Sequence, residues 1–503
     1  MSRIIQVAPL VALPTHAAIF DYLWEMKIIP QRGMIVEIPF RRKKVFGVIL
    51  DIKDASQFKL RAIDEQVPHF FLISREIDFL KSLSSHTSES VGSLAQHMLP
   101  PFTKKNLTTL ENRTERPSYK NEQSKLQYAW YGSPTVKLHA LDSLISGHSG
   151  PVAIIAPSNA DAERLVQQIQ VLGDRQIIHY ISTSSPRRTA VWKAWTEDGS
   201  QSVIVGTNLA AWLPSVTNSL TILIDPTQES YQEWEGVRYS CRNILDTRKN
   251  FFGENIIFLA HSPDTPDLSK VGSLPQLQFW PTIIDRTTEE PTTRRNFISS
   301  HIIDKISDFQ RILFFVPHLR EATHAVCKDC GALFTAEMIE HSPQCTNCHG
   351  SRFSLIGYGA ETVVNELRAQ TVISSEDTAI LLDAAKFKEL DQLQFSPDKK
   401  TVVIATTPLY TRLPLQSFDL IIDLSADFEL LHPTFQSEEL LWKRLRGTAV
   451  QFSDSWIGSW FVQTRKPDLL AWRVRDFAGY TIWWAKERDL RKRFNQAPFD
   501  ILK

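Results

Sequence analysis

The chain has 503 residues, which is enough for about three or four domains of roughly 100–200 residues each. Hydrophobic residues make up 43% and charged residues 22%, and 56 basic side chains balance 56 acidic ones. This balance excludes a globally basic nucleic-acid binder, so any contact with a polyanion must come from a local patch. The apolar start carries only Arg3 ahead of it and is interrupted by Pro9 and Pro14, so a signal peptide is not expected. No run reaches the roughly 18 apolar residues of a membrane span.

Residues 1–102 have the pattern of a β-rich domain followed by helices. Two β-branched runs, at 35–39 and 45–51, predict a hairpin. Residues 1–61 hold ten lysines and arginines against five acidic residues, a local net charge of +5. Such a charge run is often only a solvated hairpin tip, and the alternative is an edge that contacts phosphates. The basic residues of the expected turn are Arg41, Arg42, Lys43 and Lys44.

Residues 103–124 are polar with only two leucines, which predicts a linker. Residues 125–275 then have the pattern of an α/β lobe. A buried strand at 203–205 ends in Gly206-Thr207, and another at 220–224 ends in Asp225. Strands that stop at small or acidic residues indicate a parallel sheet with its site at the carboxyl ends of the strands. A strand at 152–156 and an amphipathic helix at 160–172 fit the same lobe.

The nucleotide motifs expected in such a lobe are altered. A phosphate loop reads G-x-x-x-x-G-K-[ST], and near Trp130–Lys137 the second glycine is missing. Lys137 comes one residue early, and Leu138 replaces the hydroxyl that binds Mg²⁺. Asp225 survives, but Pro226 stands where a glutamate would act as general base. We therefore expect Lys137 and Asp225 to be remnants, ATP hydrolysis to be lost, and nucleotide and Mg²⁺ binding to be an open question.

Residues 276–475 form a second lobe, with strands expected at 312–316, 401–405 and 420–423. Two C-x-x-C pairs, separated by 14 residues, are inserted at 325–352. This spacing is typical of a zinc ribbon, and paired cysteines of this kind indicate a metal site in a reducing compartment. The predicted ligands of one structural Zn²⁺ are Cys327, Cys330, Cys345 and Cys348. Four thiolates complete the site, so three nearby histidines are not needed: His324, His341 and His349. Cys241 lies far away and is expected in a core.

The end of the chain is basic and rich in tryptophan. Residues 464–503 hold ten lysines and arginines against five acidic residues. Trp472, Trp483 and Trp484 among these charges suit contact with a single strand, although tryptophans at helical spacing more often serve packing. A basic helix is expected at 476–503.

Two stretches resemble one known family. The first lobe carries Gly206-Thr207, the strand that ends at Asp225, Ser230-Tyr231 and Glu235-Gly236-x-Arg238-Tyr239-x-x-Arg242. The N-terminal part carries Phe20-Asp21-Tyr22, Gly33, Pro39-Phe40, Gly47, Leu60-Arg61-Ala62-Ile63 and the run 94–101. These residues are similar to those of the PriA family of primosomal replication-restart helicases (primosomal protein N′).

The resemblance implies that residues 1–102 are a 3′-DNA-binding domain whose pocket holds the terminal nucleotide of a nascent strand. Its Phe-Asp-Tyr corresponds to Phe20, Asp21 and Tyr22, and its pocket lysine to Arg61. An aromatic ring can stack on the terminal base, and an acid can accept a hydrogen bond from a free 3′-OH. The family's Pro-Phe-Gly is altered, because Arg41 stands where the glycine would allow a close backbone approach.

The resemblance also shows what is altered or missing in this chain. The family's Asp-Glu-Glu-His is replaced by the residues from Asp225 to Gln228, and its Gly-Arg-x-Gly-Arg is absent after the Glu439-to-Leu445 stretch. Arg444 and Arg446 are therefore expected at the surface or in structural roles. The family's winged helix has no room in the linker, and its second zinc site has no cysteines here.

The expected architecture is an α/β multidomain protein. It has a β-rich N-terminal DNA-binding domain, two RecA-like helicase lobes and a small zinc-ribbon insertion in the second lobe. The expected function is binding of branched or single-stranded DNA at replication forks for restart and primosome assembly. The expected protein partners are single-stranded DNA-binding protein and helicase-loading proteins. The protein is expected to be a monomer in the bacterial cytoplasm, associated with the nucleoid and not with a membrane. An active ATP-dependent helicase and a scaffold that does not bind DNA are the alternatives.

Overall fold

A computed structural model gives the structure of the chain, and the predicted linker and the last seven residues lie outside the part that it describes. The described residues are 3–13, 18–63, 65–100, 127–169, 175–181, 184–197, 199–233, 237–263, 274–289, 296–317, 324–335, 338–339, 343–356, 359–374, 376–382, 395, 399–406, 410, 413–431, 437–453, 455–469, 472, 474–475 and 477–496. Of the residues named above, Pro14, Glu235, Gly236 and His341 therefore lie outside it, as do residues 170–172 of the predicted helix and residue 101 of the run 94–101. None of the helices in the described ranges is long and apolar enough to cross a bilayer.

Two compact units make up the chain. The first contains Met1–Trp130 and Leu138–Asp264, and the second contains Tyr131–Lys137 and Thr265–Lys503. The N-terminal domain and the first lobe thus belong to one unit, although the sequence places a polar linker between them.

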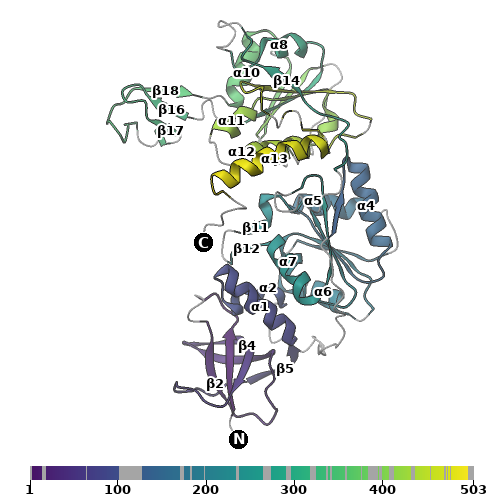
Figure 1. The fold of residues 1–503 in the computed structure, drawn as a ribbon, viewed down its shortest axis with the longest axis vertical. Helices are drawn as coiled ribbons and strands as arrows, with labels where there is room; N and C mark the ends of the chain where they lie inside the picture. The colour runs from purple at the N-terminus through teal and green to yellow at the C-terminus, as the bar shows by residue number, and fades with distance from the viewer. Residues whose placement is uncertain are drawn as a thin grey trace. The chain divides into compact units, whose positions relative to one another are not determined.

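The N-terminal part of the first unit is a five-stranded antiparallel sheet with the strand order β2-β1-β4-β3-β5 (Figure 1). Phe40 of β3 pairs with Lys43 of β4, so the predicted hairpin is confirmed and only Arg41 and Arg42 form its turn. One face of the sheet buries Tyr22, Trp24 and neighbouring apolar side chains. The strands are β1 Arg3–Pro9, β2 Phe20–Trp24, β3 Met34–Phe40, β4 Lys43–Lys53 and β5 Glu65–Phe71.

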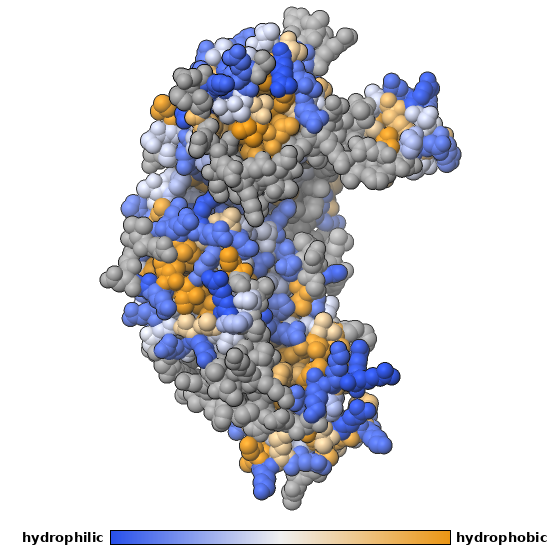
Figure 2. All heavy atoms as spheres, turned by 180° about the vertical axis from the view of Figure 1, so that it is seen from behind, coloured by the Kyte–Doolittle hydropathy of each residue, from blue (hydrophilic) through white to orange (hydrophobic). Residues whose placement is uncertain are grey.

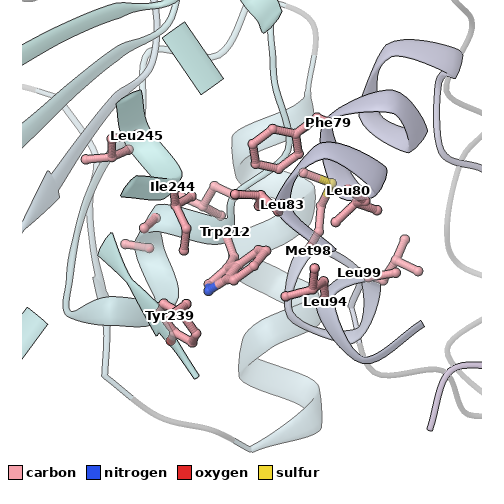
Figure 3. Close-up of a cluster of buried hydrophobic side chains, with 14 of the residues drawn as sticks. Phe79, Leu80, Leu83, Leu94, Met98, Leu99, Trp212, Tyr239, Ile244 and Leu245 are labelled. Carbon is pink, nitrogen blue, oxygen red and sulfur yellow. The ribbon is translucent and has the colours of Figure 1, made fainter. Parts of the chain in front are cut away.

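Two helices after this sheet, α1 (Ser74–Thr87) and α2 (Val91–Met98), join the N-terminal domain to the first lobe. Helix α2 begins where the Ser90 hydroxyl accepts a hydrogen bond from the Ser93 backbone N–H, at 3.1 Å. Both helices bury apolar side chains in one cluster with residues of the lobe (Figure 3). The labelled side chains of that cluster are Phe79, Leu80, Leu83, Leu94, Met98, Leu99, Trp212, Tyr239, Ile244 and Leu245. A shared apolar core makes these two parts one structural unit.

The first lobe is built on a six-stranded parallel sheet with the order β6-β13-β10-β7-β9-β8. The expected strands are confirmed, and β9 and β10 are buried along their whole length, as both faces of a parallel sheet require. The strands are β6 Gln127–Trp130, β7 Val152–Ile155, β8 Ile177–Tyr180, β9 Val203–Gly206, β10 Leu220–Ile224 and β13 Asn255–Ala260. The helices are α4 Pro134–Ser146, α5 Asn159–Ile169, α6 Ser185–Thr196 and α7 Cys241–Phe252, and a short hairpin pairs β11 Gln232–Glu233 with β12 Tyr239–Ser240.

The second lobe repeats this architecture with a parallel sheet of order β14-β22-β21-β15-β20-β19. Its strands are β14 Thr282–Asp285, β15 Arg311–Val316, β19 Thr378–Leu382, β20 Thr401–Thr406, β21 Leu420–Asp423 and β22 Ser459–Thr464. Its helices are α8 Ser300–Ile306, α10 Ala360–Ala369, α11 Ala426–Leu431, α12 Ser437–Ala449 and α13 Phe477–Arg493.

Helix α13 is held on α12 by aromatic packing and buried charge. Trp483 stacks on Trp442 with ring centroids 5.8 Å apart. The Arg491 guanidinium donates to the Glu439 carboxylate at 2.7 Å, with both side chains almost fully buried. The tryptophans of this helix therefore pack inside the second unit, and Trp472 is buried as well.

A three-stranded antiparallel sheet of order β17-β16-β18 is inserted between β15 and α10. It consists of β16 His324–Cys327, β17 Leu333–Thr335 and β18 Phe353–Ile356. It carries the four paired cysteines, so the predicted ribbon insertion in the second lobe is confirmed.

Candidate functional site

The basic turn of the N-terminal hairpin is exposed and has an unusual backbone. The side chains of Arg41, Arg42, Lys43 and Lys44 all face solvent. Arg41 has φ 57°, in the left-handed region that glycine adopts without steric cost. Its guanidinium lies 5.6 Å from the ring centroid of Phe40. The backbone shape of a glycine turn is therefore kept while the side chain adds a positive charge.

Two aromatic residues of β2 reach the end of β3 at this hairpin. The ring of Phe20 packs edge-on against that of Phe40, with centroids 5.2 Å apart. The Tyr22 hydroxyl donates to the Pro39 carbonyl at 3.2 Å. Burial raises the pKa of Tyr22, and the nearby Arg61 guanidinium partly offsets this. Tyr22 is thus a core residue, whereas Phe20 is only half-buried.

Asp21 points to the opposite face from its neighbours in β2, as alternation along a strand requires. Its carboxylate accepts a hydrogen bond from the Ser56 hydroxyl at 2.7 Å, and the Lys53 ammonium lies 3.6 Å away. Only 8% of its side chain is exposed. A carboxylate has about four acceptor positions, so these two partners leave capacity for a further donor.

Arg61 lies beside the same strand. Its carbonyl accepts from the Leu23 backbone N–H at 2.9 Å, and the Ile63 N–H donates to the Leu23 carbonyl at 3.2 Å. The structure therefore brings Phe20, Asp21, Tyr22 and Arg61 together around β2, with Tyr22 and Asp21 on opposite faces. In Figure 2 the N-terminal domain is at the bottom, where strongly hydrophilic side chains project beside apolar areas.

The four paired cysteines form one cluster. All four sulfurs lie within 4.8 Å of one another, with 3.5 Å between those of Cys327 and Cys348 and 3.6 Å between those of Cys330 and Cys345. Tetrahedral Zn²⁺ with Zn–S bonds of about 2.3 Å would separate its ligand sulfurs by about 3.8 Å, so the cluster fits such an ion. A hydrogen bond involving the Ala332 backbone lowers the pKa of the Cys330 thiol. For Cys348, the hydrogen bond with the Gly350 backbone lowers the pKa, but contacts with Cys330 and Cys327 outweigh it and raise the pKa.

The two halves of this cluster have the same backbone shape. The Gly331 N–H donates to the Cys327 carbonyl at 2.9 Å, and the His349 N–H donates to the Cys345 carbonyl at 2.8 Å. Gly331 has φ 75° and His349 has φ 61°, so both knuckles end in the left-handed conformation. His349 is exposed and serves as this turn residue outside the four-sulfur set.

The turn between β6 and α4 does not have the length of a phosphate loop. Only Tyr131, Gly132 and Ser133 separate the strand from a helix that begins at Pro134. A Cβ on Gly132 would lie 3.0 Å from the Cβ of Pro275, and both residues belong to the second unit. The Lys137 ammonium lies 5.4 Å from the ring centroid of Tyr131.

Asp225 is buried at the carboxyl end of β10. It has φ 49°, and its carboxylate accepts from the His261 backbone N–H at 3.3 Å. The buried Tyr231 hydroxyl donates to the Ile224 carbonyl at 2.5 Å and lies 3.0 Å from the Ile155 carbonyl, at the ends of β10 and β7. Burial raises the pKa of Tyr231 well above its usual value. Protein groups thus surround the strand ends where the sequence predicts a nucleotide site.

Arg444 and Arg446, which lie beside the position of the absent Gly-Arg-x-Gly-Arg, both have structural partners. Arg444 donates to the Asp423 carboxylate at 3.1 Å and covers the ring of Tyr410 at 4.8 Å. Arg446 is fully buried and donates to the carbonyls of Arg475 at 3.2 Å and Pro275 at 2.9 Å. These contacts agree with the structural roles expected from the sequence.

Several residues of the candidate DNA site were not predicted from the sequence. Lys53 and Ser56 hold Asp21, and Phe58 stands exposed beside them. Nothing in their spacing marks them, because their contacts depend on the loop after β4 returning to β2.

Comparisons with known proteins agree with this organisation. Residues 9–100 match the model of the PriA 3′DNA-binding domain. Replication restart protein PriA of Rickettsia felis is 22% identical over 557 residues, covering 95% of this chain and 83% of the relative. Its counterpart in Borreliella burgdorferi is 19% identical, covering 90% of this chain and 77% of the relative.

Two solved structures also align with the chain. RecG bound to a three-way DNA junction covers 84% of this chain and 54% of its own at 12% identity, with a TM-score of 0.38. S. cerevisiae Dbp5 bound to RNA and ADP BeF3 covers 83% of this chain and 91% of its own at 11% identity, with a TM-score of 0.37.

The parallel sheets of the two lobes, the N-terminal antiparallel sheet and the four-cysteine ribbon define a protein of the helicase-like class with two RecA-like lobes. The N-terminal domain matches the PriA 3′DNA-binding domain, and the similarity to replication restart proteins PriA extends over nearly the whole chain at 19–22% identity.

Proposed function

We propose that this protein binds branched DNA at replication forks and acts in replication restart and primosome assembly. The observation that carries the proposal is the match of residues 9–100 to the 3′DNA-binding domain, supported by an exposed basic hairpin. Long-range attraction to phosphates would come from Arg41, Arg42, Lys43 and Lys44. The Asp21 carboxylate and Arg61 would receive the 3′ end of a strand, and Phe20, on the opposite face of β2, would support the hairpin through Phe40.

ATP hydrolysis has no part in the proposed function. Leu138 and Pro226 lack the groups that bind Mg²⁺ and activate water, and the turn at Gly132 is too short to cradle phosphates. Arg444 and Arg446 already bind protein groups. Because these two arginines are held by protein groups, they also support a function without ATP hydrolysis.

The ribbon would hold one structural zinc ion through its four cysteines. The proposed protein partners are single-stranded DNA-binding protein and helicase-loading proteins. We propose that the protein acts as a monomer at the nucleoid, in the bacterial cytoplasm. These partners follow from the resemblance to the PriA family.

The test compares two forks that differ only in the 3′ end of the nascent strand, a hydroxyl or a phosphate. Wild-type protein should prefer the hydroxyl, because it can donate a hydrogen bond to Asp21 while a phosphate is repelled by it. A hydrogen bond to a charged group contributes about 1.5–3 kcal/mol, so the preference should be on the order of tenfold to a hundredfold.

Asp21→Ala should remove this preference, and Asp54→Ala should keep it, since Asp54 is an exposed acid in the same part of the chain. If wild-type protein binds both forks equally, the 3′-end pocket is wrong although the hairpin can still bind DNA. Absence of any fork binding at low salt would support the scaffold instead.

A further inference from the structure

The loop after β4 is attached to β2 at two points. Near its start, the Ser56 hydroxyl donates to the Asp21 carboxylate at 2.7 Å. Near its end, the Arg61 carbonyl accepts from the Leu23 backbone N–H at 2.9 Å. The segment between these anchors therefore runs beside the strand that carries the candidate pocket.

Phe58 lies between the two anchors and is 74% exposed. Its backbone N–H donates to the Ser56 hydroxyl oxygen at 3.3 Å, and the same hydroxyl contacts Asp21. The Phe58 amide nitrogen is thus at most about 6 Å from that carboxylate oxygen, the sum of 3.3 and 2.7 Å. The ring is presented to solvent from a backbone fixed next to Asp21.

A single exposed apolar side chain is ordinary at a protein surface, so exposure alone indicates nothing. The surroundings of Phe58 are more informative. Its neighbours in the chain, Gln57 and Lys59, are exposed polar residues. Three cations occur on the same stretch, Lys53, Lys59 and Arg61. Exposed aromatic rings beside cations are the usual composition of a single-strand platform.

We propose that Phe58 is a base-stacking residue of the 3′-end site, with Lys59 and Arg61 contacting the adjacent phosphates. This inference rests on the proposed DNA-binding function and adds a residue that determines how the strand end is held. The base nearest the terminus would stack on Phe58 while its 3′-OH donates to Asp21. Stacking depends on the π-face that every base possesses, so the contact does not select sequence.

The experiment measures affinity of the full chain for a fork with a free 3′-OH, carrying either an intact or an abasic nucleotide at that end. For wild-type protein the abasic end should weaken binding roughly 5- to 100-fold, the range for removal of one aromatic–base stack. Phe58→Ala should weaken binding to the intact fork by a similar factor and should show no further weakening with the abasic fork.

Three further variants separate stacking from other roles. Phe58→Trp should retain the base dependence, because indole also stacks. Phe58→Leu should lose it, because leucine keeps apolar volume without a π-face. Phe494→Ala removes a phenylalanine of similar exposure, 65%, that directly follows α13, and it should not change binding to either fork.

If wild-type protein binds forks but the abasic nucleotide has the same effect in wild type and Phe58→Ala, the stacking role is wrong and the DNA-binding proposal stands. The stacking role would also be wrong if the abasic nucleotide weakened binding equally in Phe58→Leu and in wild type, because leucine can make only an apolar contact. If wild-type protein binds no fork at all, both proposals fail.

Discussion

Phe79 of α1 packs against Phe252 of α7, with ring centroids 5.4 Å apart, so a helix of the N-terminal domain and a helix of the first lobe share one core. Phe79 is fully buried and Phe252 almost so. The proposed DNA contact at β2 would therefore belong to the same structural unit as the first lobe.

Phe79→Ala should lower the free energy of unfolding by about 3–5 kcal/mol, the usual cost of a cavity left by a buried phenylalanine. Because the core is shared, protection from hydrogen exchange should fall together in α2 and in β13. Phe58→Ala is the matched control and should change stability by less than about 0.5 kcal/mol, since that ring is exposed. Loss of protection in the N-terminal sheet alone would contradict a common core.

We expect His97 in α2 to make the stability of this core depend on pH. Its ring lies 5.3 Å from that of Trp212 and 5.7 Å from that of Tyr239. Burial lowers the pKa of His97, and Arg188 lowers it further, while its hydrogen bond with Ser93 and the carboxylates of Glu233 and Glu89 partly offset this.

Because the folded-state pKa is below the ordinary value, the unfolded chain binds the proton more readily. Stability from the neutral ring is fully present above about pH 6.5 and is lost as the pH falls below it. Urea unfolding at pH 7.5 and 5.5 should therefore show a smaller pH effect for His97→Gln than for wild type. Some dependence should persist, because burial also lowers the pKa of His148 and His179. An unchanged pH effect in the variant would exclude His97 as a contributor.

The four-cysteine cluster should bind one zinc ion per chain. Elemental analysis of the purified protein should give one zinc, and Cys345→Ser should give none, because structural sites need the complete ligand set. Cys241→Ser should retain the metal, since that buried thiol lies outside the cluster. Such sites contribute on the order of 10 kcal/mol to the folding of isolated ribbons, so chelation should unfold the ribbon. Zero or two zinc ions in wild-type protein would refute the assignment.

No DNA-stimulated ATP hydrolysis is expected above background. Phosphate release measured with and without forked DNA should be equal within error. Any residual ATP hydrolysis should be the same in Lys137→Ala and in wild-type protein, because Lys137 lies over the Tyr131 ring and the turn before α4 is too short for a phosphate loop. Turnover that disappears in Lys137→Ala would mean that the divergent motifs still form an active site.

The sequence predicted those parts of the fold that depend on local pattern. The short run at Leu220–Ile224, rich in β-branched and apolar residues, favoured a strand buried on both faces, and the cysteine spacing predicted two knuckles that face each other. The shared core could not be predicted, because any amphipathic helix could bury Phe79 against its own sheet. The partners of Asp21 were missed for a related reason: Ser56 reaches it only through a loop that folds back on β2.

The backbone conformation of Arg41 could not be predicted from the motif comparison. The comparison indicated that Arg41 removes the close backbone approach that a glycine allows, and the structure adds that Arg41 keeps a left-handed backbone with φ 57°. The burial of Arg446 could not be predicted from the sequence either, because the carbonyl groups that it contacts belong to the distant residues Pro275 and Arg475.

The measurement that tests the central claim most directly is the salt dependence of fork binding by the full chain. Affinity of wild-type protein should fall as salt rises, with a slope of roughly 0.7–0.9 per phosphate neutralised. Replacing Arg41, Arg42, Lys43 and Lys44 by glutamine should reduce that slope by about this amount for each phosphate that the hairpin no longer neutralises. The same change at four exposed cations of the C-terminal helix should leave it unchanged: Lys486, Arg488, Lys492 and Arg493. Wild-type protein that binds no fork at low salt, or a slope that responds to the α13 variant and not to the hairpin variant, would contradict the account.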